Sequence, residues 1–356
     1  MTSCSHQPSH FEIAPMSFVA NAWNQELPYL SKVVDEYRFL KKKRVAIALS
    51  GGVDSSVAAL ILKLASAELV GLTMRLGNVE NLSQENVGSK KSCCSYEDME
   101  DARRVCELLE IPYYGLNFTK HFKKYIIEPF VESYLNGQTP SPCVKCNNHL
   151  KFNELSLKTK QLDCEYLATG HYAQKISIDD SDALVQAVDG KKDQTYFLNG
   201  ISQEELSHSL FPLGKLYKTQ VREIAAYFGL PNHSKKESQE ICFVPNQDYA
   251  GFIKRYTHTS HIAVGNFIDT LGNVLGKHEG IIHYTVGQRK GIGIAKAEPY
   301  YVLEIRKDSN EVVIGNKSEL ACNALFAKEI NWIVPAEADL SSVKATVKIR
   351  YRDSGK

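Results

Sequence analysis

A short glycine turn between two apolar segments constrains the fold of this chain more than any other feature. The turn at residues 50–56 reads Ser-Gly-Gly-Val-Asp-Ser-Ser; it follows an apolar run at 45–49 and precedes another at 57–62. This order predicts a strand, a tight turn and the start of a helix. Two glycines let the backbone approach an anion closely, and the first turn of a helix offers unpaired N–H groups at the positive end of its dipole. We therefore expect a phosphate-binding loop here.

The composition of this loop narrows the kind of phosphate site. It lacks the Gly-Lys-Ser/Thr of a Walker A motif and the third spaced glycine of a dinucleotide fingerprint. An ordinary strand-to-helix turn is the alternative, but Asp54 followed by two serines favours the phosphate site. The loop resembles the pyrophosphate loop of the ATP pyrophosphatase group, whose members cleave ATP between the α- and β-phosphates. The resemblance implies ATP as substrate, Mg²⁺ to neutralise the phosphates, and transfer of AMP.

Length and composition limit the classes to which the chain can belong. It has 356 residues, of which 43% are hydrophobic, and a net charge of +1. That length suffices for two or three domains, and a charge this small gives no global basic field, although a local basic stripe is enough to bind RNA. No apolar run is long enough to cross a bilayer, and the N-terminus lacks a signal-peptide core. We expect a cytoplasmic protein without membrane contact, whose nine cysteines form no disulfide framework.

Apolar runs alternate with helix-like segments from Arg44 onward. The sequence predicts strands at 45–49, 69–74, 113–117 and 166–169, and helices at 55–65, 96–109, 122–136 and 149–162. This alternation is typical of an α/β fold in which helices cover both faces of a Rossmann-like parallel sheet. The resemblance of the loop implies the adenine nucleotide alpha hydrolase type of this fold. Ligands of such sheets bind at the carboxyl ends of the strands, where the glycine loop lies.

Changes in residue composition and pattern along the chain suggest four parts. Residues 1–40 are expected to be an N-terminal extension outside the catalytic core, with a short amphipathic helix within 24–40. Residues 41–258 are the expected ATP-binding catalytic domain, and the glycine-punctuated region 259–312 a small β domain. Residues 313–356 are expected to be a partial C-terminal β-barrel. Its last strand-like stretch, 342–352, would have an unpaired edge, so we expect this domain to be truncated.

Two cysteines follow a rigid proline turn at residues 139–147, Thr-Pro-Ser-Pro-Cys-Val-Lys-Cys-Asn. A helix N-terminus and the neighbouring Lys145 would favour the thiolate of Cys143 or Cys146, as a nucleophile requires. A structural zinc half-site and buried thiols are the alternatives. Zinc is disfavoured because the neighbouring pair, Cys93 and Cys94, is adjacent and chelates one tetrahedral ion poorly.

A combination of motifs resembles the tRNA-specific 2-thiouridylase family. The motifs are residues 50–56, 92–95 with Asp98 and 101–103, 139–152, 170–173, 192–198, 238–243 and 283–291. The resemblance spans residues 44–352. It implies that the chain replaces the 2-oxo group of the wobble uridine (position 34) of tRNA with sulfur. It also implies two partners: the anticodon arm of tRNA, and a protein that donates sulfur as a persulfide.

The resemblance assigns roles to individual residues. Cys242 would carry the persulfide and Cys146 would be its partner nucleophile, either releasing sulfide or leaving a disulfide that a reductant reopens. Taken alone, Cys242 would be interpreted as a core residue. The positions implied for ATP are Ala48, Leu49, Ser50, Gly51, Gly52, Val53, Asp54 and Ser55, with Met74 and Gly170 beside the adenine and ribose.

The positions implied for tRNA come from four segments. Ser141, Pro142 and Cys143 would contact the target base, and the other positions are His171, Lys192, Asp193, Gln194, Arg350 and Tyr351. An arginine can clamp a phosphate and a tyrosine can stack on a base. Without the resemblance, Met74 would be a core residue, His171 a polar residue in a turn, and the segment around Lys192 a solvated loop. Some family members carry an aspartate at the position of Cys143, so the resemblance supplies no acid/base group there.

Two alternatives to this function remain open on the sequence. Cys143, Cys146 and Cys242 are also the set that would hold an iron–sulfur cluster, as in related tRNA thiolases. A non-catalytic ATP- and tRNA-binding relative would keep the fold without turnover. The intact glycine loop and thiols argue against the second alternative.

Overall fold

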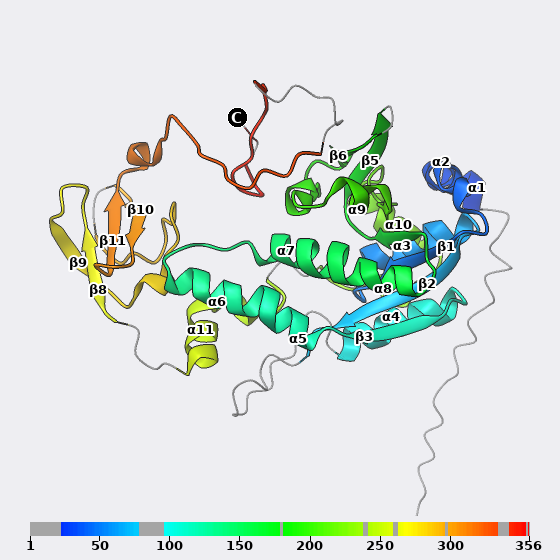
Figure 1. The fold of residues 1–356 in the computed structure, drawn as a ribbon, viewed down its shortest axis with the longest axis horizontal. Helices are drawn as coiled ribbons and strands as arrows, with labels where there is room; N and C mark the ends of the chain where they lie inside the picture. Colours follow the sequence, from blue (N-terminus) through cyan, green and yellow to red (C-terminus); the bar gives the residue numbers. More distant parts are fainter. Residues whose placement is uncertain are drawn as a thin grey trace, which may run out of the picture.

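A five-stranded parallel sheet forms the centre of the larger part of the molecule (Figure 1). The computed structural model describes residues 23–77, 96–178, 181–237, 241–258, 263–295, 298–333, 342–353 and 355. The strand order is β3-β2-β1-β4-β7, and the strands are β1 (Arg44–Ala48), β2 (Glu68–Arg75), β3 (Tyr113–Asn117), β4 (Tyr166–Thr169) and β7 (Ser209–Leu210). The predicted Rossmann-like sheet is confirmed. The strands β1 to β4 could be predicted separately from the sequence.

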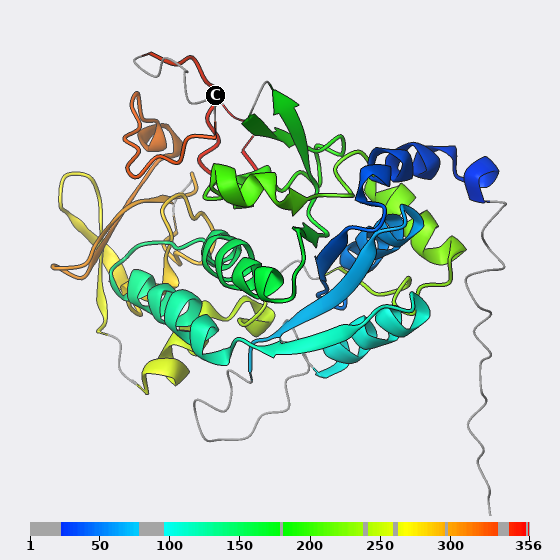
Figure 2. The same cartoon turned by 45° about the vertical axis from the view of Figure 1, so that its right-hand side comes forward.

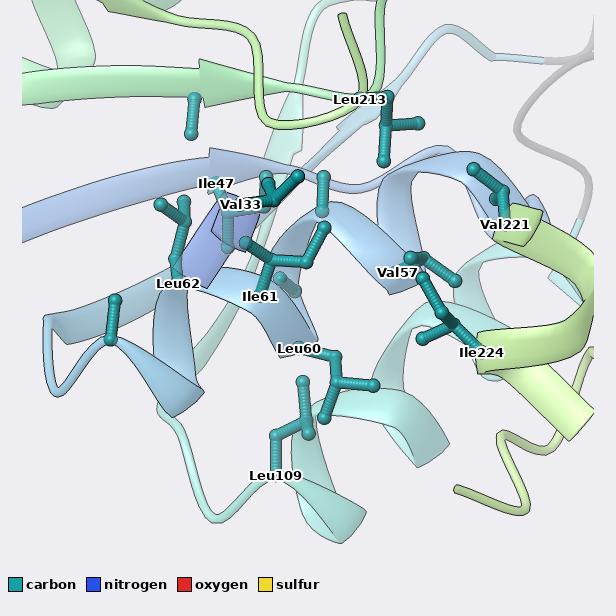
Figure 3. Packing of buried hydrophobic residues seen from close by; sticks show 14 of the residues in the cluster. Val33, Ile47, Val57, Leu60, Ile61, Leu62, Leu109, Leu213, Val221 and Ile224 are labelled. Carbon is teal, nitrogen blue, oxygen red and sulfur yellow. The ribbon is translucent and has the colours of Figure 1, made fainter. Parts of the chain in front are cut away.

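One face of the sheet is covered by four helices, with α3 at their centre. These are α2 (Pro28–Glu36), α3 (Val53–Leu64), α4 (Tyr96–Leu108) and α10 (Lys218–Tyr227). Figure 3 shows their buried side chains packing together, with Ile47 from β1, Ile61 from α3 and Ile224 from α10. We call this set the α3-side cluster. Nine of the twelve residues of α3 are buried, since helices and sheet surround most of it, and this explains why it is apolar on most sides.

The N-terminal region contributes to this cluster. Helices α1 (Trp23–Glu26) and α2, with the short η2 (Arg38–Leu40), bury Trp23, Leu30 and Val33 against the core. We expected residues 1–40 to lie outside the catalytic core, but Trp23 onward forms part of it. The reason is an apolar stripe at spacings of three and four residues along α2, which covers α3.

Two long helices cover the opposite face. The first runs through α5 (Thr119–Phe122), the π-helical η4 (Lys123–Ile127) and α6 (Glu128–Leu135); the second runs through α7 (Pro142–Lys145), the π-helical η5 (Cys146–Leu155) and α8 (Ser156–Gln161). Their buried residues join Leu72, Met74 and Phe243 in what we call the α6-side cluster. The first helix agrees with the predicted 122–136. The second begins at Pro142, earlier than the predicted His149, because proline with its fixed φ suits the first helical position.

Smaller elements frame the sheet beyond β4. An antiparallel pair, β5 (Ala173–Ile178) with β6 (Ser181–Gln186), precedes η6 (Thr195–Leu198) and α9 (Gln203–Ser207). Two further elements, η7 (Pro245–Gln247) and α11 (Tyr249–Thr257), follow the segment that carries Cys242. The sequence analysis predicted none of these elements.

A second, four-stranded sheet forms the predicted small β domain. Its order is β10-β11-β8-β9, with β8 (Gly265–Ile268), β9 (Val274–His278), β10 (Tyr301–Arg306) and β11 (Glu311–Gly315), and it also carries η8 (Ile281–His283). Phe267, Tyr284 and Val302 are among the residues of its own core. Strand β11 runs across the expected boundary between residues 312 and 313, since it pairs with both β10 and β8.

The remainder of the chain differs from the expectation for residues 313–356. After η9 (Lys317–Leu320), the described residues 321–333 and 342–353 form no helix or strand. A strand exists only where a neighbouring strand pairs with it, and none of the described segments pairs with 342–352. This last segment instead packs on η6, where the rings of Tyr351 and Phe197 are 4.6 Å apart. Figure 2 shows the red C-terminal end of the chain close to green segments from the middle of the sequence.

Candidate active site

The turn between β1 and α3 folds into a tight loop lined by polar groups. Leu49 still belongs to the sheet, since its N–H donates to the backbone of β2 at 2.8 Å, and Gly52 is the N-cap of α3. The Ser55 side chain lies across the turn: Ser50 N–H donates to Ser55 Oγ at 3.2 Å, and the two hydroxyl oxygens are 3.3 Å apart. Residues 48–55, all expected to contact ATP, thus form the end of a strand, a turn and the first turn of a helix. We call this segment the ATP loop.

Two glycines in this region have no room for a side chain. Gly51 has φ +70°, and a Cβ there would lie 2.2 Å from the backbone oxygen of Asp98. At Gly170, which follows β4, a Cβ would lie 2.6 Å from the backbone nitrogen of Ser55. Glycine is thus needed at both positions because neighbouring backbone packs closely against them. The N-terminus of α3 beside them is the kind of site that binds phosphate, and its contact with ATP stays a prediction.

Asp54 is held by an ion network that comes from a distant part of the chain. Lys218 Nζ donates to Asp54 Oδ1 and Oδ2 at 2.7 and 2.8 Å, and Tyr172 OH donates to Oδ1 at 2.8 Å. Lys218 Nζ also lies 2.9 Å from Glu237 Oε1, and Lys192 Nζ lies 2.6 Å from Glu237 Oε2. Burial alone would raise the pKa of Glu237, but hydrogen bonds from Lys192 and Lys218 outweigh it and lower this pKa to about 2. The network therefore joins the ATP loop to the loop of Lys192.

A second lysine fixes the backbone of Gly51. Lys235 Nζ donates to Gly51 O at 3.1 Å, to Asp98 Oδ1 at 2.6 Å and to Asp101 Oδ2 at 2.5 Å. Asn232 Nδ2 donates to the same Gly51 oxygen at 3.0 Å. Burial opposes the charge on Lys235, yet the hydrogen bonds to the two aspartates raise its pKa. This contact gives Asp98 and Asp101, near the start of α4, a structural role beside the loop.

Removing the central ammonium of the Asp54 network is expected to destabilise the fold. Lys218→Met removes the ammonium that pairs with Asp54 and leaves Glu237 with Lys192 as its near cation, and only 11% of the Lys218 side chain is exposed. We expect a loss of about 2 kcal/mol in the free energy of unfolding, measured by urea denaturation. Lys160→Met is the matched control, since it removes the exposed Lys160–Glu204 pair and is expected to cost less than about 0.5 kcal/mol. Equal losses would contradict this role for Lys218.

Cys146 and Cys242 approach the core from two different segments. Both side chains are half-buried and pack against the α6-side cluster. Ala48, where the ATP loop begins, packs against the same cluster. Cys143 is exposed on the first turn of α7. Both candidate catalytic thiols therefore lie around the cluster that also receives the entrance to the ATP loop.

The two cysteines of the proline turn differ in their helical positions. Ser141 is the N-cap, Pro142 is buried at the first helical position, and Cys143 follows it. We expected both cysteines to precede the helix, but Cys146 begins the second, π-helical section η5. The helix dipole therefore favours a thiolate more at Cys143 than at Cys146, because its effect is confined to the first turn.

The residues expected beside adenine and ribose lie on the two strands that flank β1. Met74 is buried near the end of β2, and Gly170 directly follows β4. Because β1 lies between β2 and β4, both positions border the edge of the sheet where the ATP loop begins. Their contact with the nucleotide stays a prediction.

His171 is buried next to Gly170. Its Nδ1 lies 2.7 Å from Thr169 Oγ1 and its Nε2 lies 3.4 Å from Lys151 Nζ. Burial, and then the charge on Lys151, hold the pKa of His171 well below its ordinary value, so the imidazole is neutral. A buried neutral imidazole suits a packing role as well as the tRNA contact implied by the resemblance.

This buried histidine predicts a loss of stability in acid. The unfolded chain binds a proton on His171 near pH 6.5 and the folded chain does not, so stability falls as the pH falls below that value. His171→Gln is expected to remove up to about 1.4 kcal/mol per pH unit from this dependence, measured by urea denaturation between pH 7 and 5. The exposed His208 supplies the control, since His208→Gln should leave the slope unchanged. A slope unaltered by His171→Gln would contradict the assignment.

The loop of Lys192 is organised by its own side chains. The Asp193 carboxylate is buried and accepts hydrogen bonds from Ala187 N–H at 3.0 Å and Thr195 Oγ1 at 2.8 Å. Gln194 Oε1 accepts from Tyr172 N–H at 3.0 Å. Asp193 and Gln194 therefore hold the loop, and their contact with tRNA stays a prediction.

Arg350 and Tyr351 reach the same region from the last described segment. Arg350 Nη2 donates to Val286 O at 2.7 Å, within the motif at 283–291. Tyr351 packs on Phe197 of η6, and burial raises the pKa of its hydroxyl. The fold thus brings together two of the predicted tRNA segments, although more than 150 residues separate them in sequence.

Two family models match the chain. One, described as tRNA methyl transferase HUP domain, matches residues 43–246, and the other, tRNA methyl transferase PRC-barrel domain, matches residues 250–316. The curated relatives include tRNA-specific 2-thiouridylase MnmA of Clostridium botulinum strain Eklund 17B, which is 44% identical over 88% of this chain and 85% of its own length. The chain belongs to the tRNA-specific 2-thiouridylase family.

Other members of the tRNA-specific 2-thiouridylase family match to a similar extent. The protein of Lachnoclostridium phytofermentans is 45% identical over 88% of this chain and 87% of its own length. That of Geotalea uraniireducens is 46% identical over 88% of this chain and 83% of its own length. The resemblance read from the motifs is therefore confirmed at the level of the family.

Two of the expectations for this 2-thiouridylase family member concern metals and membranes. Within the described ranges, no three His, Cys, Asp or Glu side chains are grouped so that they could hold a metal ion. Cys93 and Cys94, which entered the zinc alternative, lie outside those ranges, as does the motif at 92–95. In the part of the chain that the structure describes, no helix combines the length and apolar character of a membrane span.

Several residues of this 2-thiouridylase-type site were missed by sequence reasoning. Lys218, Glu237, Lys235 and Asn232 all contact the ATP loop or the side chains that hold it. They come from helix α10 and the segment after it, more than 160 positions from the loop. No spacing or motif signalled them, because the fold alone brings them to Asp54 and Gly51.

Proposed function

We propose that this chain is a tRNA 2-thiouridylase, which uses ATP to replace the 2-oxo group of uridine 34 with sulfur. One observation carries the proposal: the entrance to the ATP loop, at Ala48, and the thiols of Cys146 and Cys242 all pack around the α6-side cluster. This shared packing supports a site in which the loop activates an oxygen and the two thiols deliver sulfur. Methyl transfer, which the description of the matched family models names, would require neither feature.

The first step is adenylation of the base. The O2 atom of uracil attacks the α-phosphorus of ATP, the bond from that phosphorus to the bridging oxygen breaks, and pyrophosphate leaves with the electron pair. N3 of uracil releases its proton to water. In this proposal the backbone at residues 50–55 holds the phosphates, and Met74 and Gly170 border the adenine and ribose. A bound Mg²⁺ would neutralise the charge on the pyrophosphate. Catalysis then consists of positioning and charge stabilisation.

The second step is transfer of sulfur. A donor protein leaves a persulfide on Cys242, and its terminal sulfur attacks C2 of the base, so that AMP departs with the former O2. The Cys146 thiolate then attacks Cys242 Sγ and breaks the bond to the transferred sulfur. The products are a C2 thiocarbonyl, reprotonated at N3, and a Cys146–Cys242 disulfide. A thiol reductant returns the two electrons and reopens the disulfide.

The RNA is proposed to lie over the segments that surround these groups. Ser141, Pro142 and Cys143 form the rigid turn next to the extruded base. Lys192 and Arg350 are suited to phosphates, and Tyr351 to stacking on a base. His171, Asp193 and Gln194 are proposed to support the loop of Lys192 from below the RNA. The anticodon arm is the part of tRNA that carries the target uridine.

The decisive experiment is reconstitution with unmodified tRNA. The full chain is incubated with ATP, Mg²⁺, sulfide and a transcript that carries uridine 34, and both pyrophosphate and 2-thiouridine are measured. We expect both products, with pyrophosphate release dependent on tRNA. A folded protein that binds ATP and tRNA yet forms neither product would instead support the non-catalytic alternative.

A further inference from the structure

Lys151 occupies a position that the π-helical geometry of η5 makes significant. Cys146 is the first residue of η5 and Lys151 is the fifth residue after it. A π-helix closes its hydrogen bonds over five residues, so Lys151 lies about one turn above Cys146 on the same side of the helix. In an α-helix, five residues run well past one turn and the two side chains would diverge. The unusual helix thus places an ammonium on the side of the catalytic thiol.

The contacts of Lys151 place it beside the ATP loop as well. Its Nζ lies 3.4 Å from Nε2 of His171, the neighbour of Gly170, whose Cα faces the backbone nitrogen of Ser55. An ammonium only donates, so Nε2 is the acceptor, and the imidazole proton resides on Nδ1, which donates to Thr169 Oγ1. The buried ring therefore holds the Lys151 ammonium beside the residue that follows Gly170.

The charge of Lys151 differs from that of the other lysines around the loop. Lys192, Lys218 and Lys235 are each neutralised by at least one carboxylate. Lys151 is half-buried, and the polar partner recorded for it among the described residues is the neutral imidazole of His171. A partly desolvated ammonium without a counter-charge is stabilised when an anion arrives. Among the described residues, therefore, no ion pair is recorded for the Lys151 ammonium, in contrast to these three lysines.

We propose that Lys151 is a catalytic residue of the adenylation step, whose ammonium contacts the α-phosphate oxygens as O2 of uracil bonds to the phosphorus. This inference rests on the proposed function and names a residue for its first step. Negative charge builds on the phosphoryl oxygens in the transition state, and a preoriented cation there stabilises it more than it stabilises bound ATP. In this proposal Lys151 acts through its charge and adds no proton transfer to the step.

The test compares three variants in the tRNA-dependent release of pyrophosphate. Lys151→Met is expected to lower kcat about 30-fold with the KM for ATP changed less than about threefold, as for loss of a transition-state contact. Lys151→Arg, which restores the charge, should recover at least about a third of the rate. Lys158→Met is the matched control, since Lys158 is exposed on α8 and contacts only Gln161 among the described residues; it should behave as wild type.

The outcomes separate this inference from the proposed function. If wild-type protein releases no pyrophosphate with tRNA, the proposed function fails. If wild type is active and Lys151→Met retains its kcat, or Lys151→Arg is as impaired as Lys151→Met, the inference alone is overturned. Should Lys151→Met melt at a lower temperature than wild type, Lys151→Gln retains a donor for His171 without the charge. A normal kcat in that variant would equally overturn the role.

Discussion

Replacing either Cys146 or Cys242 with serine is expected to lower persulfide-dependent formation of 2-thiouridine by more than about 1,000-fold. The hydroxyl of serine can neither carry a persulfide nor resolve one. Adenylation involves neither thiol in the proposed sequence, so pyrophosphate should still be released in the first turnover. The measurement is a single-turnover assay in which pyrophosphate and 2-thiouridine are quantified in the same sample.

Cys143→Ser is the control within the same turn. Cys143 is exposed and stands outside the α6-side cluster against which the other two thiols pack, so we expect its loss to change the rate less than about fivefold. Equal loss at all three cysteines would contradict the two-thiol route. It would favour the cluster alternative, which anaerobic preparation and visible absorbance would then test.

Gly51→Ala is expected to weaken ATP binding by about 100-fold and to lower stability. The φ of +70° costs an alanine about 1–2 kcal/mol, and the added Cβ would meet the Asp98 backbone at 2.2 Å. Because backbone cannot rotate away as a flexible side chain can, the loop and α4 would have to separate. ATP affinity measured by calorimetry, and stability measured by urea denaturation, should fall together.

Two other glycines separate the causes of this effect. Gly229 has φ +62° with open space around its Cβ position, and Gly190 has open space without a positive φ. Gly229→Ala should lower stability by only the conformational cost, with ATP affinity unchanged, and Gly190→Ala should change neither quantity. If Gly51→Ala binds ATP as tightly as Gly190→Ala does, the loop is not the phosphate site.

The sequence predicted the sheet because its central strands, β1, β2 and β4, are apolar runs that are largely buried. Strands at 113–117 and 166–169 agree with β3 and β4 residue for residue. The ATP loop was equally legible, since two glycines and three hydroxyl groups lie within seven positions. Such local patterns can be predicted because the residues that form each strand or turn are close together in sequence.

The features that escaped prediction depend on contacts between distant segments. Nothing around Lys218 marks it as the partner of Asp54, because the pairing exists only once α10 packs on α3. The second long helix begins at Pro142 and not at the predicted residue 149, so Cys146 was placed ahead of a helix that in fact contains it. The stretch 342–352 alternates like a strand, but without a paired neighbour it lies against η6 instead.

The position of helix α2 has a practical consequence for anyone who trims this chain. The family match begins at residue 43, which invites a shortened version from that point. Such a version would discard Trp23, Leu30, Val33 and Leu40, and would strip the apolar covering from α3, the helix that begins at the ATP loop. We expect the shortened protein to aggregate through the exposed apolar face of α3, and the proposed ATP loop to lose the packing that supports it. The part of the chain that matches the family model therefore begins later than the part that folds as one unit.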